Sequence, residues 1–406
     1  MKIAVISDLH FGYGWGTELE NDSFENADMA IQSAIANGAD LILLAGDIFD
    51  SRFPKTDVLA RATKILVKPL LENDRGVNFV SCGNKKLKQI SQRTLRHLPI
   101  IAIHGTHERR YGVNTVEALE NAGILIHLHK ETICLEKDGI CIAIHGLSGL
   151  PERYAKQALE EWKPKPIDRC VNILMLHQSI DPFIYSPLEP AMLKLNDLPI
   201  GFDLIVDGHI HTHRIEKANG TPLLFPGSTI ITQFEENEAN IEKGFYLIDI
   251  EKERKLNVKF LKIESRKFFY IKISANGALR ERMEKELDAI LANNFLKPPI
   301  VRIKITGSSS ELIEQELKDV ERKYSGKVVL RIVKDLKTPE LLKKIEFLRN
   351  IREQKLSVEE LGLELLKENL KELNFGNSFN YEKVFNILVN GNIDNAFNLL
   401  MSKDVK

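Results

Sequence analysis

Histidine and aspartate residues are concentrated in five short motifs, each at or just after the end of a short apolar run. In chain order these motifs are Asp8-Leu9-His10, Gly46-Asp47, Gly105-Thr106-His107-Glu108, Leu176-His177-Gln178 and Gly208-His209-Ile210-His211. Taken singly, each histidine is better explained as a hydrogen-bonded core or loop residue. Five such motifs at the carboxyl ends of predicted strands indicate a metal site, because α/β proteins gather their active sites there.

These residue types suit the hydrolysis of a phosphodiester bond. Two divalent ions about 3.5–4 Å apart can clamp a phosphate and lower the pKa of a bound water, which supplies a nucleophile at neutral pH. Such a site needs one carboxylate that bridges the ions, and Asp47 is the candidate. Imidazole and carboxylate ligands favour borderline to hard ions, so Mn²⁺, Fe²⁺ and Zn²⁺ are all admissible.

The elements that must position these motifs are short strands with helices between them. Continuous apolar runs are typical of strands buried on both faces, and they occur at 2–7, 40–45, 99–104, 171–176 and 202–206. Amphipathic helices are predicted at 24–36 and 56–71, and Asn219-Gly220 predicts a hairpin. Residues 1–264 are therefore predicted to form one α/β or α+β sandwich.

Two further regions follow. Residues 265–337 alternate strand, helix, strand, helix, strand, which predicts a compact βαβαβ module. From about 338 to 406 the chain is helical and rich in Lys and Glu, with a capping-box pattern that begins at Ser357. These last helices are too few to bury their apolar faces alone. They are expected to dock on a partner or on the body of the protein, and a self-contained mini-bundle is the alternative.

Bulk composition narrows the class of protein. A length of 406 residues predicts two or three domains, and a net charge of −1 gives no global attraction to nucleic acid, so any DNA contact must come from local basic patches. The four cysteines contain no C-x-x-C pair, so neither a disulfide framework nor a zinc ribbon is expected. The sequence shows no signal peptide and no membrane span, so a soluble protein in a reducing compartment is expected.

The order of the five motifs resembles the signature of the calcineurin-like metallophosphoesterases. More narrowly, the chain is similar to the double-strand-break repair nucleases of the Mre-eleven–Rad-fifty complex, called SbcD in bacteria. Supporting stretches are Leu176-His177-Gln178-Ser179, Val206-Asp207-Gly208-His209-Ile210-His211 and Pro226-Gly227-Ser228-Thr229. The motif resemblance covers 1–264, and beyond it only the layout is similar. It implies a four-layer αββα sandwich, a small DNA-binding capping domain at 265–337 and a partner-binding helical region at 338–406.

The resemblance also implies roles for individual residues. The first of two metal ions would be held by Asp8, His10, Asp47 and His211. The second would be held by Asp47, His177 and His209. His107 would act as a general acid on the leaving oxygen, and the alternative is a histidine that orients another ligand.

One position departs from the family pattern. Thr106 stands where the family has an asparagine ligand. A hydroxyl is a weaker and shorter donor than an amide carbonyl, so either Thr106 ligates directly, a water fills the gap, or the second ion binds weakly. Asn84 could supply an amide from a neighbouring loop, although it lacks the histidine that follows in the family motif.

Several residues could contact DNA. Lys85 and Lys86 begin a basic run that continues to Arg96, and a solvated surface loop is an equally good interpretation. Arg109 and Arg110 follow the His107 motif and are better placed to meet a backbone phosphate. Tyr13, in a glycine-spaced aromatic loop, could stack on bases, and a packed loop that anchors the site is the alternative.

We therefore predict a Mn²⁺-dependent DNA exonuclease and endonuclease that processes DNA ends. It would be a homodimer in a prokaryotic or archaeal cytoplasm and would bind a Rad-fifty-type ATPase through its C-terminal helices. Two alternatives remain open. One is another calcineurin-like enzyme, such as a phosphoprotein phosphatase or a small-nucleotide phosphodiesterase. The other is a DNA-end scaffold with a weakened metal site.

Overall fold

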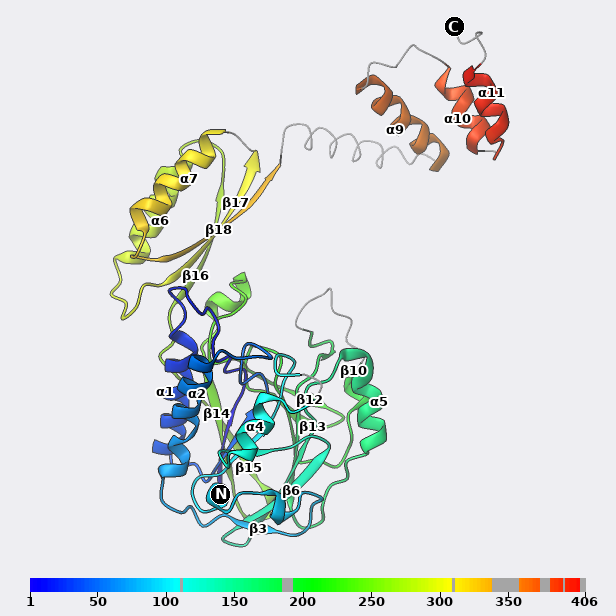
Figure 1. The fold of residues 1–406 in the computed structure, drawn as a ribbon. Coiled ribbons are helices and arrows are strands. Elements are labelled where there is room, and N and C mark those ends of the chain that lie inside the picture. The colour runs from blue at the N-terminus through cyan, green and yellow to red at the C-terminus, as the bar shows by residue number, and fades with distance from the viewer. Residues whose placement is uncertain are drawn as a thin grey trace. The chain divides into compact units, whose positions relative to one another are not determined.

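The computed structural model describes residues 1–109, 112–184, 193–308, 311–337, 358–372, 380–389 and 391–401. The chain divides into two compact units (Figure 1). Unit 1 comprises residues 1–271, 285–303 and 321–332, and unit 2 comprises 272–284, 304–320 and 333–406. The module predicted at 265–337 has residues in both units, so the division into three domains stays a prediction.

The first sheet of unit 1 has six strands in the order β15-β14-β1-β2-β4-β5. Their bounds are β1 Lys2–Ile6, β2 Leu41–Ala45, β4 Ile100–Ile103, β5 Ile126–His127, β14 Gly244–Ile250 and β15 Leu256–Lys262. Strands β1, β2, β4 and β5 are parallel, whereas β14 is antiparallel to both of its neighbours. Every residue of β2 is buried, as its unbroken Leu-Ile-Leu-Leu-Ala run predicts.

The second sheet has seven strands in the order β12-β13-β11-β8-β7-β6-β3. Their bounds are β3 Asn78–Val80, β6 Glu131–Lys137, β7 Ile140–Gly146, β8 Val171–Leu176, β11 Leu204–Asp207, β12 Arg214–Ala218 and β13 Thr221–Phe225. The predicted hairpin is confirmed: Asn219 and Gly220 join β12 to β13 with φ of 50° and 86°, the left-handed geometry that such tight turns require. Strands β9 (Ile180–Asp181) and β10 (Leu193–Lys194) form a separate pair.

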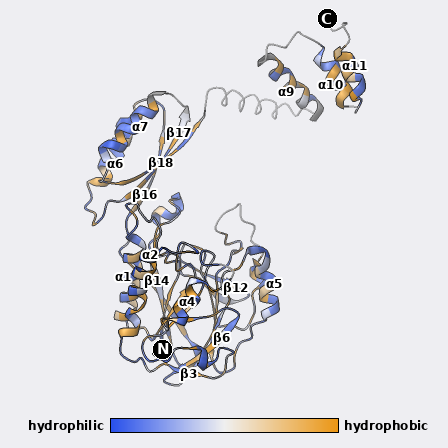
Figure 2. Cartoon of the chain, in the orientation of Figure 1, coloured by the Kyte–Doolittle hydropathy of each residue, from blue (hydrophilic) through white to orange (hydrophobic). Residues whose placement is uncertain are grey.

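The two sheets pack face to face, and helices cover their outer faces. Successive residues of β1 point to opposite faces of the first sheet. Val5 packs with Ile144 and Ile173 in the core between the two sheets, whereas Ile6 packs in the core between the first sheet and its helices. Helix α1 (Asp22–Ala36) places Phe24, Ala27 and Ile31 on that outer side, beside α2 (Thr56–Leu66). On the other side, Leu159 of α5 (Glu152–Trp162) covers β8 and β11. The expected αββα sandwich is thus confirmed, and Figure 2 shows apolar residues (orange) along its strands.

The remaining elements are a small sheet and several helices. Strands β16 (Phe268–Ser274), β17 (Ile300–Ser308) and β18 (Val329–Lys337) form a three-stranded sheet, with α6 (Leu279–Leu291) and α7 (Glu311–Tyr324) between them in sequence. Further helices are α3 Gln92–Leu95, α4 Thr115–Asn121, α9 Val358–Glu372, α10 Tyr381–Val389 and α11 Ile393–Met401. The helix start expected at Ser357 lies outside the described residues.

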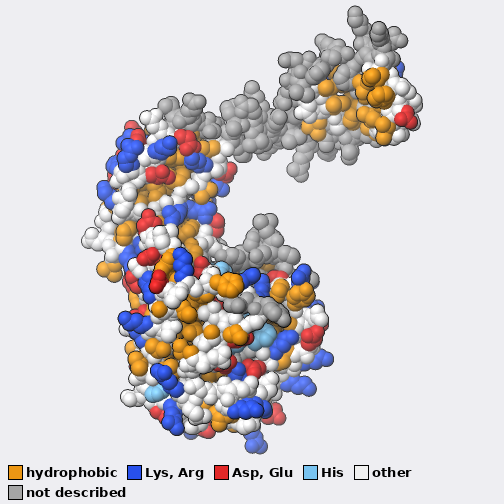
Figure 3. All heavy atoms as spheres, viewed as in Figure 1, with side chains coloured by type: hydrophobic (Ala, Val, Ile, Leu, Met, Phe, Trp, Pro, Cys, Tyr) orange, Lys and Arg blue, Asp and Glu red, His pale blue; other side chains and the backbone are white. Residues whose placement is uncertain are grey.

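The surface carries both signs of charge. Lys and Arg side chains are interspersed with Asp and Glu over the face drawn in Figure 3, as the net charge of −1 leads one to expect. Within the described part of the chain, no helix combines the length and the apolar character that a membrane span requires.

The cysteine prediction was wrong. The structure joins Cys82 to Cys134 and Cys141 to Cys170 in two disulfides. The cysteines come from elements that are distant in sequence, and only the pairing of β3, β6, β7 and β8 in one sheet brings them together. A search for closely spaced cysteines in the sequence cannot find an arrangement of this kind.

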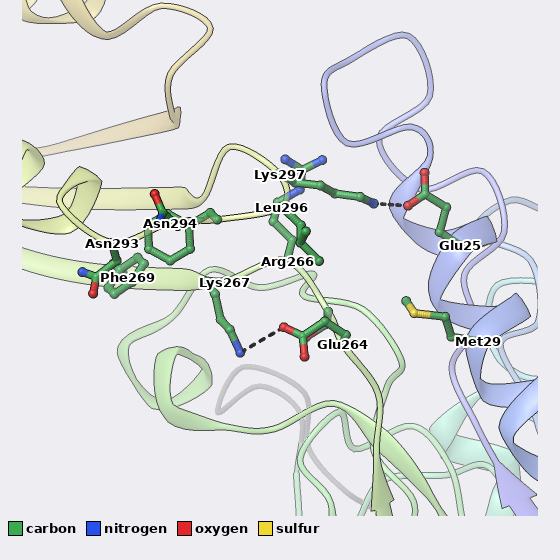
Figure 4. Close-up of a pocket in the computed structure, with 12 residues that line it drawn as sticks. Glu25, Met29, Glu264, Arg266, Lys267, Phe269, Asn293, Asn294, Leu296 and Lys297 are labelled. Carbon is green, nitrogen blue, oxygen red and sulfur yellow. Dashed lines mark ion pairs between the residues drawn. The ribbon is translucent and has the colours of Figure 1, made fainter.

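A buried ion pair connects α1 to the segment before β16. Arg266 Nε and Nη2 lie 2.5 and 2.8 Å from the two carboxylate oxygens of Asp22, and both side chains are less than a tenth exposed. Lys297 Nζ lies 3.1 Å from Asp22 Oδ1 and also pairs with Glu25. Figure 4 shows Lys297 reaching Glu25 across the edge of a pocket, which Met29 and Leu296 also line.

Replacing Arg266 by methionine should destabilise unit 1. The substitution keeps most of the side-chain volume but leaves the Asp22 carboxylate buried with Lys297 as its remaining cation. Breaking a buried pair in this way costs about 3–5 kcal/mol. We expect a clear fall in the urea midpoint of the full chain. Lys262→Met, which removes the exposed pair with Glu242, is the control and should change the midpoint far less. Equal shifts in the two variants would contradict the assignment.

Candidate metal centre

The candidate ligands all lie in loops that follow parallel strands. Asp8 and His10 come after β1, Asp47 after β2, His177 after β8, and His209 and His211 after β11. The first two strands belong to the six-stranded sheet and the last two to the seven-stranded sheet. The carboxyl ends of strands from both sheets therefore meet at one place, as the motif order predicted.

The ligand atoms form overlapping groups. Asp8, His10 and His211 make one group, and Asp47, His177 and His209 make another, with the ligand atoms of each group within 4.8 Å of one another. A third group consists of His10, Asp47 and His107. Asp47 thus belongs to two groups, which is the position expected of a bridging carboxylate.

Several buried polar atoms at this place suit a bound cation. Asp8 is fully buried, and neither of its carboxylate oxygens has a hydrogen-bond partner among the described residues. His177 Nε2 is likewise buried without a hydrogen bond, 3.1 Å from Asp47 Oδ2. His211 Nε2, 3.5 Å from Asp8 Oδ1, is an ion-pair partner of this carboxylate but does not use all of its lone pairs. Burying a carboxylate without hydrogen bonds is costly, whereas a divalent ion would use these lone pairs. The residues present therefore fit a metal centre.

Each histidine ligand is oriented by a hydrogen bond at its other ring nitrogen. These contacts are His10 Nδ1 with Asp50 Oδ1 (3.2 Å), His177 Nδ1 with Ala45 O (2.8 Å), His209 Nε2 with Ser179 Oγ (2.9 Å) and His211 Nδ1 with Thr232 Oγ1 (2.6 Å). Partners of this kind fix the ring and the tautomer of a metal-bound histidine. The other nitrogens of His10 and His211 face each other at 3.2 Å.

The backbone of the ligand loops is strained. Asp8, His10, Asp47 and His209 have φ of 50°, 46°, 46° and 64°, a left-handed conformation that costs free energy in a residue other than glycine. Close approach adds a second constraint. A Cβ on Gly208 would lie 2.1 Å from Ala45 O and 2.5 Å from His177 Nδ1, so only glycine fits there. The fold thus holds these side chains at the centre against their local preference.

Charge and burial set the protonation of the metal-free centre. Burial by itself would lower the pKa of His177, but the charges of Asp47 and Asp8 raise it to about 10. Burial and the positive charge of His177 lower the pKa of His209 to about 3. Burial opposes ionisation of Asp47, yet the neighbouring His177 holds its pKa well below the usual value. A cation that binds here must therefore displace the proton of His177.

Glu108 ties two of the ligand loops together. Its carboxylate oxygens accept hydrogen bonds from the backbone N–H of Phe49 (2.6 Å) and of Gly105 (2.7 Å). Burial, followed by the charge of Asp47, raises the pKa of Glu108 to about 7. The sequence alone does not predict this role of Glu108. Asp50, Ser179 and Thr232 were not predicted as supporting residues either, although Asp50 stands three residues after Asp47 and Ser179 two residues after His177.

Thr106 and His107 lie on the solvent side of Asp47. The Thr106 hydroxyl donates to Asp47 Oδ2 (3.3 Å), and the His107 N–H donates to Asp47 Oδ1 (2.9 Å). The His107 side chain is 42% exposed, and its Nδ1 lies 2.9 Å from the carbonyl oxygen of Asp50. His107 is therefore placed where a substrate could reach it.

The candidate DNA contacts have different surroundings. The prediction that Lys85 contacts DNA was wrong. This side chain is buried, and its Nζ contacts Glu120 (3.0 Å), Glu131 (2.9 Å) and a backbone carbonyl oxygen. Lys86 is exposed and Arg109 is partly exposed. Arg110 lies outside the described residues.

Two other residues considered above, Tyr13 and Asn84, make hydrogen bonds within the fold. The Tyr13 hydroxyl donates a hydrogen bond to the carbonyl oxygen of Thr232. This contact agrees with the alternative that the aromatic loop is packed and anchors the site. Asn84 bonds the backbone of Thr132 and of Lys130, and the structure does not bring it to the centre.

Replacing Asp47 by asparagine should remove the shared carboxylate and its negative charge and so weaken metal binding. Loss of an outer hydrogen-bond partner alone costs about 10- to 100-fold in metal affinity, so loss of this carboxylate should cost at least as much. We expect two Mn²⁺ per wild-type chain in equilibrium dialysis and fewer than one in Asp47→Asn. Asp138→Asn, at an exposed turn with φ of 52°, is the control. An Asp47→Asn chain that retained two tight ions would contradict the bridging role.

Comparisons with known proteins agree with this geometry. The sequence model described as calcineurin-like phosphoesterase matches residues 1–213. Proteins named DNA double-strand break repair protein Mre11 from Methanopyrus kandleri and Thermoplasma acidophilum are each 26% identical, over 78% and 82% of this chain. The double-strand break repair protein MRE11 of Mus musculus is 26% identical over 80%.

The chain covers 67% of the M. kandleri protein and 84% of the T. acidophilum protein, but only 48% of the mouse protein. The matched region 1–213 exceeds half of the 406 residues and contains all five motifs. Asp47 also belongs to two of the three groups of candidate ligands. On these grounds, the chain belongs to the calcineurin-like phosphoesterase family, whose fold implies divalent metal ions.

Proposed function

We propose that this protein is a two-metal-dependent DNA nuclease, with exonuclease and endonuclease activity, that processes ends in double-strand-break repair. The observation that supports this proposal most directly is that Asp47 belongs to two groups of candidate ligands. One group contains His177 and His209, and the other contains His10 and the exposed His107. Relatives named as double-strand break repair proteins, which match about four fifths of the chain, support DNA as the substrate.

The divalent ions, which we propose to be Mn²⁺, would supply charge stabilisation and an activated water when bound. Asp8, His10, Asp47 and His211 would hold one ion, and Asp47, His177 and His209 the other, with the Thr106 hydroxyl beside Asp47. The hydrogen bonds of the histidines to Asp50, Ala45, Ser179 and Thr232 keep the rings in place while substrate enters.

His107 is suited to proton transfer at the leaving oxygen. Its Nδ1 faces the carbonyl oxygen of Asp50, which can only accept, so Nδ1 carries a proton and donates. Nε2 is then the atom that exchanges a proton, and it lies 3.9 Å from Asp47 Oδ2. We infer that Nε2 protonates the oxygen that leaves the phosphate.

DNA would be held by local basic residues, since charges of both signs are interspersed on the surface (Figure 3). Arg109, two residues beyond His107, and the exposed Lys86 are the candidates. We also propose that 265–337 forms a capping domain that contacts DNA. The bounds of this domain are based on the order of its strands and helices, which resembles that of the family's capping domain.

The C-terminal helices are proposed to bind a Rad-fifty-type ATPase. Helices α10 and α11 contact each other and are rich in apolar residues (Figure 2). Ile393, Phe397 and Met401 are 70%, 60% and 70% exposed, an arrangement typical of helices that bind in a groove. We further propose a homodimer in the cytoplasm of a prokaryote or archaeon.

Replacing His107 by alanine should slow DNA cleavage by about 10²- to 10⁴-fold, the usual contribution of a general acid. Binding of two Mn²⁺ should persist. The measurement is Mn²⁺-dependent degradation of end-labelled duplex DNA, with a generic phosphomonoester as a second substrate. His97→Ala, whose ring bonds the backbone of Glu72, is the control.

The outcomes separate the alternatives. Faster turnover of the phosphomonoester than of DNA would indicate a phosphatase. DNA binding without degradation, unchanged in His107→Ala, would indicate a DNA-end scaffold. Either result would contradict the nuclease assignment.

Replacing Thr106 by asparagine should lower the Mn²⁺ concentration needed for half-maximal cleavage, because an amide carbonyl reaches farther and donates more strongly than a hydroxyl. Thr106→Val, which has the same shape as threonine without the hydroxyl, should not lower it. The measurement is a Mn²⁺ titration of cleavage at fixed DNA. An identical Mn²⁺ requirement in wild type, Thr106→Asn and Thr106→Val would show that position 106 does not limit metal binding.

A further inference from the structure

Four neighbouring strands of the seven-stranded sheet each bring one cysteine to the same place. The strands are β3, β6, β7 and β8, which are adjacent in the sheet. Cys82 follows β3 by two residues, Cys134 lies in β6, Cys141 lies in β7 and Cys170 directly precedes β8. These are all the cysteines of the chain.

The register explains why their side chains share one face. Cys134 is paired with Ala143, and Cys141 stands two residues before Ala143 on the same strand. Residues two apart on a strand point to the same side, so Cys134 and Cys141 occupy one face. Val171 is paired with Ile142, which places Cys170 beside Cys141.

Three of the four sulfurs lie close enough to share one ion, and the fourth, that of Cys134, is bonded to Cys82. Each sulfur is within bonding distance of its disulfide partner, and the Sγ atoms of Cys82, Cys141 and Cys170 also lie within 4.8 Å of one another. The two pairs are therefore in contact. In a tetrahedral zinc site, with Zn–S of about 2.3 Å, the sulfurs are separated by roughly 3.8 Å. To join them on one ion, the Cys134 sulfur would have to leave Cys82 and move toward Cys141 and Cys170.

The four cysteines differ in their exposure to solvent. Cys134 and Cys170 are buried against Ala143, with Val80 and Ile167 packed around them. Cys141 is partly exposed and Cys82 is exposed. An ion could enter from solvent, and Cys82 would complete its coordination from the outer side.

The cluster is distinct from the centre around Asp47. Strand β8 runs from Cys170 at one end to His177 just beyond the other. A strand rises about 3.3 Å per residue, so the two sites are roughly 23 Å apart. The ligand chemistry also differs, because soft thiolates select zinc-type ions and the histidine and carboxylate centre admits harder ones.

We propose that Cys82, Cys134, Cys141 and Cys170 form a tetrathiolate site for a zinc-type ion, and that the two disulfides are its oxidised, metal-free form. Each disulfide takes up two electrons and two protons to give two thiols. Zn²⁺ then replaces the four thiol protons, which are released to solvent. A phosphine can supply the electrons: one equivalent per disulfide becomes the phosphine oxide, with its oxygen from water.

The test uses the full chain reduced with tris(2-carboxyethyl)phosphine, stripped of metal and titrated anaerobically with Co²⁺. We expect four titratable thiols after reduction. Co²⁺ should then produce a thiolate-to-metal charge-transfer band, which histidine and carboxylate ligands do not give. One added equivalent of Zn²⁺ per cysteine site, beyond that taken up around Asp47, should abolish the band.

Variants separate the two sites. Cys82→Ser and Cys141→Ser should each bind Co²⁺ at the thiolate site at least tenfold more weakly, whereas Ser81→Ala, at the exposed neighbour of Cys82, should match wild type. Asp47→Asn should keep the band. Cys82 is exposed, so its replacement leaves the core intact. Lack of a charge-transfer band in reduced wild type, or disulfides that persist in excess reductant, would overturn the proposal.

Discussion

The centre of this protein depends on two carboxylates, Asp8 and Asp47, held almost entirely away from water. A carboxylate in that position is stable only with compensating charge or hydrogen bonds. For Asp47, the N–H of His107 and the charge of His177 provide part of this compensation. For Asp8 the oxygens have no hydrogen-bond partner among the described residues. The strands and loops around Asp8 and Asp47 position the histidines, and a bound cation, close to these carboxylate oxygens.

That placement requires rigid supports, because the ligand loops are strained. Four ligands adopt left-handed backbone conformations, which persist only where the neighbouring structure fixes them. The strands before them are buried on both faces, and Glu108 bonds the backbones of two ligand loops. Substitution of Glu108 would therefore act through the position of Asp47 and not through direct contact with an ion.

Local patterns predicted the parts of the site that are local. Each ligand follows an apolar run, so strand, loop and residue type together located Asp8, Asp47 and His177. The supporting residues were not predictable, since Ser179 and Thr232 bond histidines 30 and 21 residues away through loop geometry. The prediction for Lys85 failed because a run of basic residues is usually exposed, whereas the fold brings Glu120 and Glu131 to this side chain. The cysteine cluster depends on strand order, which no spacing rule encodes.

The two proposed sites illustrate how one fold can hold different metals. Strand β8 leads to His177 at its carboxyl end, and Cys170 directly precedes its other end. Hard and borderline ligands at one end favour ions such as Mn²⁺, and thiolates at the other favour Zn²⁺. Because β8 connects both places, an ion at the cysteines would join the strand that leads to His177 to its neighbours β3, β6 and β7. Reduction without metal would instead leave four unlinked thiols at that end of the sheet, so the proposed ion would replace the disulfides as the cross-link between β3, β6, β7 and β8.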